Sequence, residues 1–199
     1  MTLRRMSIWA AVVVALVVPV VAAAFSPLLQ WRGPIYVAAG FAGIVAMALM
    51  LLQPLMAARL LPGIAAHRSR RLHRRIGVFL ILAVVAHVAG LWITSPPDVV
   101  DVLLLRSPTP FSLWGVAAMW ALFAAGVVAA LRRRFSLGVW RVVHTALVVI
   151  VVTGTVVHAL LIDGAMETVS KWGLAVILGV ATLKAISVLR CWRTLRRQS

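Results

Sequence analysis

Long apolar runs separated by clusters of arginine dominate this 199-residue chain. Six of the runs approach the roughly 20 residues that a helix needs to cross the hydrocarbon core of a bilayer. They lie near residues 7–29, 35–58, 74–94, 112–131, 139–162 and 171–190. Because a spanning segment must satisfy its backbone hydrogen bonds internally, we expect these segments to be helices. The sequence therefore predicts an all-α membrane protein, a six-helix bundle that forms a single domain over residues 1–199.

The charge pattern supports the membrane interpretation and predicts an orientation. A net charge of +16 accompanies 63% hydrophobic residues, and the basic residues form short clusters between apolar runs, which does not favour a nucleic-acid partner. Clusters precede the first run and follow the second, fourth and sixth. The alternate connections carry all four acidic residues, Asp98, Asp101, Asp163 and Glu167. This bias predicts a multi-pass protein of a bacterial inner membrane, surrounded by lipid, with both termini in the cytoplasm.

Several other features narrow the class. The single cysteine, Cys191, excludes an intramolecular disulfide and a cysteine-based metal site. No glycine-rich phosphate-binding motif follows a strand pattern, so we expect no nicotinamide or flavin domain in these residues. The N-terminal segment has the basic start and apolar stretch of a signal peptide, but the apolar stretch continues past the potential cleavage site, which favours a retained helix. Within the connection 95–111, "VVDVLLL" is too short to span and could lie along the interface.

Two histidine pairs with equal spacing are the strongest functional signal. His73 and His87 differ by 14 residues, as do His144 and His158. On a helix, 14 residues turn through about 1400° and rise about 21 Å, so each pair lies on one face. Because the third and fifth runs cross in the same direction, His73 faces His144 and His87 faces His158. The spacing predicts two stacked bis-histidine sites between these two helices, one near each side of the membrane.

Haem b fits these sites better than the alternatives. Two opposed imidazoles between apolar walls fill both axial positions of a haem iron, which favours electron transfer. Gly77 and Gly154 lie on the histidine faces, where we expect them to let a flat macrocycle approach the backbone. Each could instead be an ordinary helix-packing glycine. Zinc usually takes four ligands, and a structural or proton-relay role would not require two matched pairs.

Other polar residues are expected to be peripheral. His67 has no partner at the matching position of the fifth run, and we expect a solvated loop residue. The arginine clusters are foremost topology signals, with a secondary role in propionate binding open to Arg74, Arg75 and Arg141.

The two histidine segments resemble a known family. "LHRRIGVFLILAVVAH" resembles the third helix of the ferric reductase-like transmembrane domain, shared by ferric reductases and NADPH oxidases, and "WRVVHTALVVIVVTGTVVH" resembles its fifth helix. The resemblance covers the six-helix plan. It implies a haem-dependent oxidoreductase that passes electrons outward, with His73 and His144 holding an inner haem and His87 and His158 an outer one.

The electron donor and acceptor differ between the proteins that this chain resembles. Well-known members carry a flavin and nicotinamide domain. We expect a separate reductase of that kind, or quinol, as donor, and a ferric complex or a periplasmic enzyme as outer acceptor. The chain is also similar to the haem subunit of the bacterial methionine-sulfoxide reductase system, whose pattern lacks the histidine present here as His73. A cofactor-free transporter or structural membrane protein remains as a third alternative.

Overall fold

The computed structural model describes residues 2–189 and is all-helical over that range. The six long apolar segments are helices, as predicted, and each is long and apolar enough to cross a membrane. A further helix, α4, joins α3 to α5. The bounds are α1 Leu3–Ala24, α2 Pro34–Ala57, α3 Ala66–Thr94, α4 Pro96–Leu103, α5 Pro110–Ala130, α6 Leu137–Leu161 and α7 Thr168–Leu189, with short 3₁₀ helices η1 Pro27–Leu29 and η2 Arg132–Arg134.

Two helices differ from the predicted bounds by more than three residues, each for a local reason. The first ends at Ala24 instead of continuing to residue 29, because Ser26 and Pro27 begin η1 and the Ser26 hydroxyl accepts a hydrogen bond from the Leu28 N–H. The third begins at Ala66, eight residues before the predicted start at 74. Hydropathy identifies only the part of a helix that lies in the hydrocarbon core, whereas the first turns of α3 extend beyond that core and are basic. Ser69 anchors this stretch by donating to the Met56 carbonyl at 2.7 Å.

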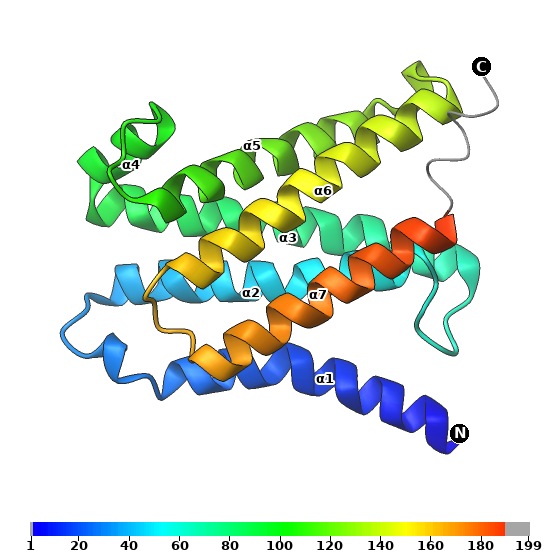
Figure 1. The fold of residues 1–199 in the computed structure, drawn as a ribbon, viewed down its shortest axis with the longest axis horizontal. Helices are drawn as coiled ribbons and strands as arrows, with labels where there is room; N and C mark the ends of the chain where they lie inside the picture. The colour runs from blue at the N-terminus through cyan, green and yellow to red at the C-terminus, as the bar shows by residue number, and fades with distance from the viewer. Residues whose placement is uncertain (1, 190–199) are drawn as a thin grey trace.

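The core of the bundle is built from two helix hairpins (Figure 1). α2 packs along α3, and α5 packs along α6, as the two closest helix pairs. α7 then packs on α2, α1 and α6, while α4 lies at one end against α3 and α5. A single cluster of buried aliphatic residues draws on α2, α3, α5, α6 and α7.

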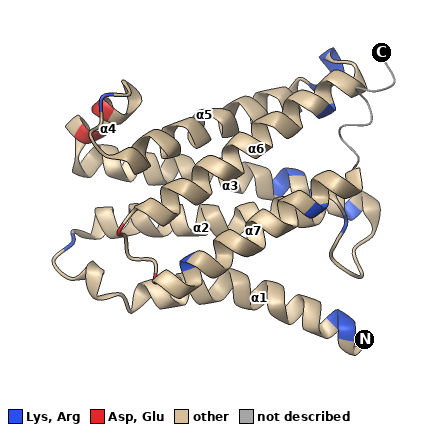
Figure 2. Cartoon of the chain, in the orientation of Figure 1, with Lys and Arg blue, Asp and Glu red and all other residues tan. Residues whose placement is uncertain are grey.

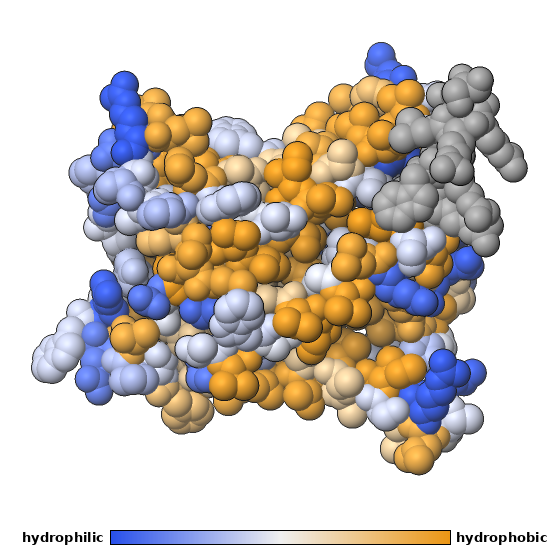
Figure 3. Space-filling view, in the orientation of Figure 1, coloured by the Kyte–Doolittle hydropathy of each residue, from blue (hydrophilic) through white to orange (hydrophobic). Residues whose placement is uncertain are grey.

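The ends of the bundle differ in charge (Figure 2). We call the end that holds Arg4, Arg5, Arg59, the first turns of α3, and η2 the basic end. The opposite, acidic end holds all four acidic residues, with Asp98 and Asp101 on α4 and Asp163 and Glu167 between α6 and α7. Apolar side chains cover much of the middle of the face shown in Figure 3, with hydrophilic residues toward the two ends. This distribution is that of a multi-pass membrane protein.

Candidate cofactor site: two histidine pairs

The four predicted histidines lie on two helices that run in the same direction. His73 and His87 are on α3, and His144 and His158 are on α6, each helix running from the basic to the acidic end. His144 lies close enough to His73 for their ring charges to interact, and the same holds for His158 and His87. The structure therefore brings together the two pairs that the spacing suggested, one toward each end of the bundle. We call them the basic-end pair (His73 and His144) and the acidic-end pair (His87 and His158).

Main-chain carbonyl groups fix both rings of the acidic-end pair. His87 Nδ1 lies 2.7 Å from the Ala39 carbonyl oxygen on α2, and His158 Nδ1 lies 2.8 Å from the Phe111 carbonyl oxygen on α5. A carbonyl oxygen accepts only, so each Nδ1 carries the proton and donates. The neutral ring then keeps a lone pair on Nε2, which is the arrangement that metal-ligating histidines typically adopt.

A glycine lies directly beneath each ring of the acidic-end pair. A Cβ atom added to Gly43 on α2 would lie 3.0 Å from His87 Nδ1, and one added to Gly115 on α5 would lie 2.8 Å from His158 Nδ1. An alanine at position 115 would force the His158 ring to shift, and one at position 43 would require the His87 ring to give way by a few tenths of an ångström. Gly43 and Gly115 therefore belong to the site, and they could not be predicted from the sequence because neither is near a histidine in the chain.

The rings of the basic-end pair are held differently. His73 Nδ1 donates to the Gln53 carbonyl oxygen on α2 over a longer 3.2 Å. Ala125 on α5 lies at the corresponding place beside His144, but His144 Nδ1 makes no hydrogen bond of ordinary geometry and is buried. The His144 ring instead stacks on Trp140, with ring centroids 5.3 Å apart and an interplanar angle of 11°. Aromatic stacking thus replaces a main-chain bond at this ring.

The two hairpins repeat the same design. On α2 the carbonyl groups beside the histidines belong to Ala39 and Gln53, which are 14 residues apart, matching the spacing of His73 and His87. On α5 the corresponding residues, Phe111 and Ala125, are again 14 apart. Each hairpin thus supplies one histidine and one supporting helix to each pair. Side-chain identities do not reveal this repeat, since the supporting groups are main-chain atoms.

The space between the two levels is hydrocarbon. Leu80 and Val151, each seven residues after the first histidine of its helix, are 2% and 4% exposed and belong to the buried aliphatic cluster. Aliphatic side chains therefore separate the basic-end pair from the acidic-end pair.

Gly77 and Gly154, the glycines singled out in the sequence, face the supporting helices. A Cβ on Gly154 would lie 2.9 Å from the Trp114 carbonyl oxygen and 3.0 Å from Ala118 Cβ on α5. A Cβ on Gly77 would lie 3.8 Å from Gln53 Oε1 on α2. Gly154 therefore has a close helix-packing role, and contact of either glycine with a cofactor stays a prediction.

The ligand set fits haem better than a bare metal ion. Within residues 2–189, no three histidine, cysteine or acidic side chains gather to hold a metal ion. Each level instead offers two imidazoles, which is the number that a six-coordinate haem iron takes from a protein. α3 and α6 are also not among the closely packed helix pairs, and only 6% and 17% of their apolar spans are buried by protein, against 39% in α2. The histidine helices thus leave surface for a flat macrocycle.

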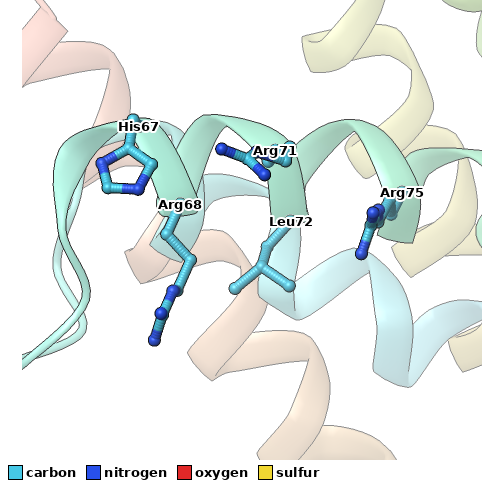
Figure 4. A pocket seen from close by; sticks show the side chains of 5 residues that line it. All are labelled: His67, Arg68, Arg71, Leu72 and Arg75. Carbon is cyan, nitrogen blue, oxygen red and sulfur yellow. The ribbon is translucent and has the colours of Figure 1, made fainter.

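The basic residues of α3 line a groove that includes none of the four paired histidines. His67, Arg68, Arg71, Leu72 and Arg75 line a groove of ≈ 320 Å³ along the first turns of α3 (Figure 4). His67 is exposed, as predicted, although it belongs to the helix and not to a loop. Arg74 and Arg141 are exposed too. Propionate binding by Arg74, Arg75 or Arg141 stays a prediction.

The fold and site define a class: a multi-pass helical membrane protein with histidine pairs stacked on two co-directional helices. A family model described as "Ferric reductase like transmembrane component" matches residues 42–155. The match covers more than half of the chain, which therefore belongs to the ferric reductase-like transmembrane family. It includes His73, His87 and His144 and ends three residues before His158. No curated protein and no solved structure matched the chain.

Proposed function

We propose that this protein carries electrons across the membrane through two b-type haems, one held by His73 and His144 and the other by His87 and His158. Membership of the ferric reductase-like family indicates transmembrane electron transfer and oxidoreductase activity. The observation that carries the two-haem proposal is the Nδ1–carbonyl bonding of His73, His87 and His158, which leaves Nε2 of each ring free to bind a metal.

The residues around each pair perform the tasks that such a site requires. When bound, haem would supply a one-electron iron couple, held by the imidazoles of each histidine pair. The carbonyl groups of Ala39 and Phe111 fix ring orientation and tautomer, and they make the imidazoles more basic ligands. The aliphatic layer around Leu80 and Val151 excludes water between the levels.

The charge asymmetry supports electron flow from the basic to the acidic end. By the positive-inside bias, the basic end faces the cytoplasm. Fusions of a periplasm-active reporter after Asp101 and after Arg133 test this orientation. We expect activity only from the Asp101 fusion, and activity only from the Arg133 fusion would reverse the direction of transfer.

The basic groove supports a separate reductase as the electron donor, with quinol as the alternative. Its three arginines form no ion pair within the described part of the chain, so the groove presents uncompensated positive charge on the turns of α3 that flank His73 (Figure 4). An acidic flavin or nicotinamide reductase would dock there through charge complementarity. Reduction by such a reductase should weaken with rising salt, whereas quinol-driven reduction should not.

At the acidic end, a ferric complex or a periplasmic enzyme is the proposed acceptor. The four acidic residues favour a cationic acceptor electrostatically. Co-purification of a periplasmic enzyme, such as a methionine-sulfoxide reductase, would favour the alternative role of haem-bearing subunit.

The visible spectrum of the purified chain tests the proposed function. We expect the reduced-minus-oxidised spectrum of six-coordinate b-type haem and two haems per chain. A chain that is folded, helical and free of haem would overturn the proposal and favour a cofactor-free transporter or structural protein.

A further inference from the structure

Three buried polar atoms make no hydrogen bond within residues 2–189, and all three surround the basic-end pair. They are Gln53 Nε2, Trp140 Nε1 and His144 Nδ1. Gln53 is the residue whose carbonyl accepts from His73, and Trp140 is the residue that stacks on His144. Buried donors without acceptors are rare in folded proteins because burial removes their water without replacement. The acidic-end pair has no such atom.

Trp140 contacts two neighbours that do not use its N–H. Its indole ring stacks on the His144 ring, and the Arg132 guanidinium lies over the indole ring, 5.5 Å from its centroid. Trp140 is one helical turn from His144, toward the basic end. The Nε1–H is therefore held beside the basic-end pair, and no group within residues 2–189 accepts a hydrogen bond from it.

Gln53 lies on α2, beside His73, the other histidine of the basic-end pair. Its main chain accepts the bond from His73, and its side-chain amide packs against Gly77 on α3, 3.8 Å from the position of an added Cβ. The next residue, Pro54, is buried within α2. The Nε2 group is thus directed by a rigid, well-packed segment, and not by a mobile surface loop.

We propose that Trp140 Nε1–H and Gln53 Nε2–H are hydrogen-bond donors to the haem at the basic end. This proposal rests on the proposed function. In haem b the four ring nitrogens bind iron, which leaves the two propionate carboxylates as strong acceptors. Bonds from neutral donors to a carboxylate are charge-assisted and are roughly twice as strong as neutral bonds. Of the three orphaned groups, His144 Nδ1 belongs to a proposed ligand ring, and the other two match the carboxylates in chemistry.

The proposal predicts an effect on the potential as well as on affinity. A donor that withdraws negative charge from a propionate reduces the negative field at the iron. Removal of the donor should therefore stabilise the oxidised form and lower the midpoint potential of the basic-end haem alone. A residue that merely supported packing would change haem retention without this selective shift.

Trp140→Phe and Gln53→Met in the full-length chain test the assignment. Both variants keep most of the side-chain volume and remove the donor. Trp120→Phe and Gln30→Met are matched controls, since Trp120 is 57% exposed and Gln30 is exposed in the α1–α2 connection. We expect several-fold weaker retention of one haem and a lower midpoint potential for that haem, with the other haem unchanged. Potentials and retention equal to those of the two controls would overturn the proposal.

Haem dimethyl ester provides a second test that needs no substitution. Both carboxylates are esterified in this analogue, so reconstituted wild-type chain should hold it less tightly than haem b at the basic end. The acidic-end haem, retained in a His73→Ala chain, should discriminate less between the two. Equal discrimination at the two ends would contradict the donor role. A wild-type chain that binds no haem at all would instead overturn the proposed function itself.

Discussion

The acidic-end and basic-end histidine pairs share one helical framework but differ in how their rings are held. At the acidic end, both rings donate to main-chain carbonyl groups at 2.7 and 2.8 Å and lie against glycine. At the basic end, one bond is 3.2 Å long, the other ring stacks on Trp140, and three polar atoms stay unpaired. A repeated hairpin therefore produces two unequal sites. Main-chain carbonyl groups orient both rings at the acidic end. At the basic end, side-chain stacking and unpaired side-chain donors distinguish the site.

The glycines beneath the acidic-end rings should give the largest difference between the two pairs. Gly115→Ala places a Cβ 2.8 Å from His158 Nδ1, which must move away from the Phe111 carbonyl. Loss of such a supporting bond typically lowers metal affinity about 10- to 100-fold. We expect selective loss of the acidic-end haem, measured as haem per chain after purification. Gly43→Ala should act in the same direction on His87 with a smaller effect, because the added Cβ is 3.0 Å away.

Gly40→Ala is the matched control for Gly43→Ala. Gly40 lies on the same helix, and a Cβ there would meet nothing within 4 Å. It should keep both haems. Equal loss from Gly40→Ala and Gly43→Ala would mean that α2 tolerates no change, and would remove the evidence for a specific contact with the ring.

The two haems should also differ in potential. Strong donation from Nδ1 to a carbonyl raises the basicity of the imidazole and favours oxidised iron. Both acidic-end rings make such bonds, so the haem lost in His158→Ala should be the one with the lower midpoint potential. A tenfold difference in reduction equilibrium corresponds to about 59 mV for one electron, which a redox titration resolves. If His158→Ala removed the higher-potential component, hydrogen bonding to the ligands would not be the dominant influence.

Lys171 should stabilise the acidic end of the bundle by capping the C-terminus of α6. This 7%-exposed lysine donates from Nζ to the Ile162 carbonyl at 2.8 Å, immediately after α6, whose last turns carry His158. A cation at a helix C-terminus that bonds the last carbonyl groups stabilises the helix. We expect Lys171→Met to lower the free energy of unfolding by about 1–2 kcal/mol, measured by thermal or denaturant unfolding in detergent. Lys184→Met, at an exposed position of the same helix, is the control and should change it little.

The smallest effect should come from the cap of α7 at the acidic end. The N–H groups of Val169 and Ser170 donate to the Glu167 carboxylate and hold its pKa below the usual 4.5. Because the folded-state pKa is the lower one, the stabilisation is complete above the unfolded-state pKa. It is lost as the pH falls through the folded-state pKa. Thermal unfolding between about pH 6 and pH 3 should show a slightly smaller loss of stability in Glu167→Gln than in wild type.

Most of the architecture followed from hydropathy and charge, because a bilayer imposes length and composition on each span. The start of α3 was missed because its basic first turns are helical through tertiary contacts, such as the Ser69 bond to Met56, and not through apolarity. The histidine spacing was visible because side-chain identity and a 14-residue period are both properties of the sequence.

The supporting parts of the site could not be predicted in the same way. Ala39 and Phe111 contribute carbonyl oxygens, which every residue possesses, so their identity carries no signal. Gly43 and Gly115 are recognisable only after the register of α2 on α3 and of α5 on α6 is known. Gly154 packs closely on α5, which is the helix-packing alternative for this glycine, and its contact with a macrocycle stays a prediction. One faint signal existed: Gly43 and Gly115 are 72 residues apart, close to the 71 that separate the corresponding histidines.

Haem content across four histidine variants tests the central claim most directly. We predict that His87→Ala and His158→Ala each lose the same haem, that their double variant loses no more, and that His73→Ala and His144→Ala lose the other. Combining His87→Ala with His144→Ala should remove both haems, whereas His67→Ala should keep two. Reduced-minus-oxidised spectra with haem per chain give the comparison. If His73 and His87 behaved instead as one couple, the account would fail, because residues about 21 Å apart along one helix cannot bind the same iron.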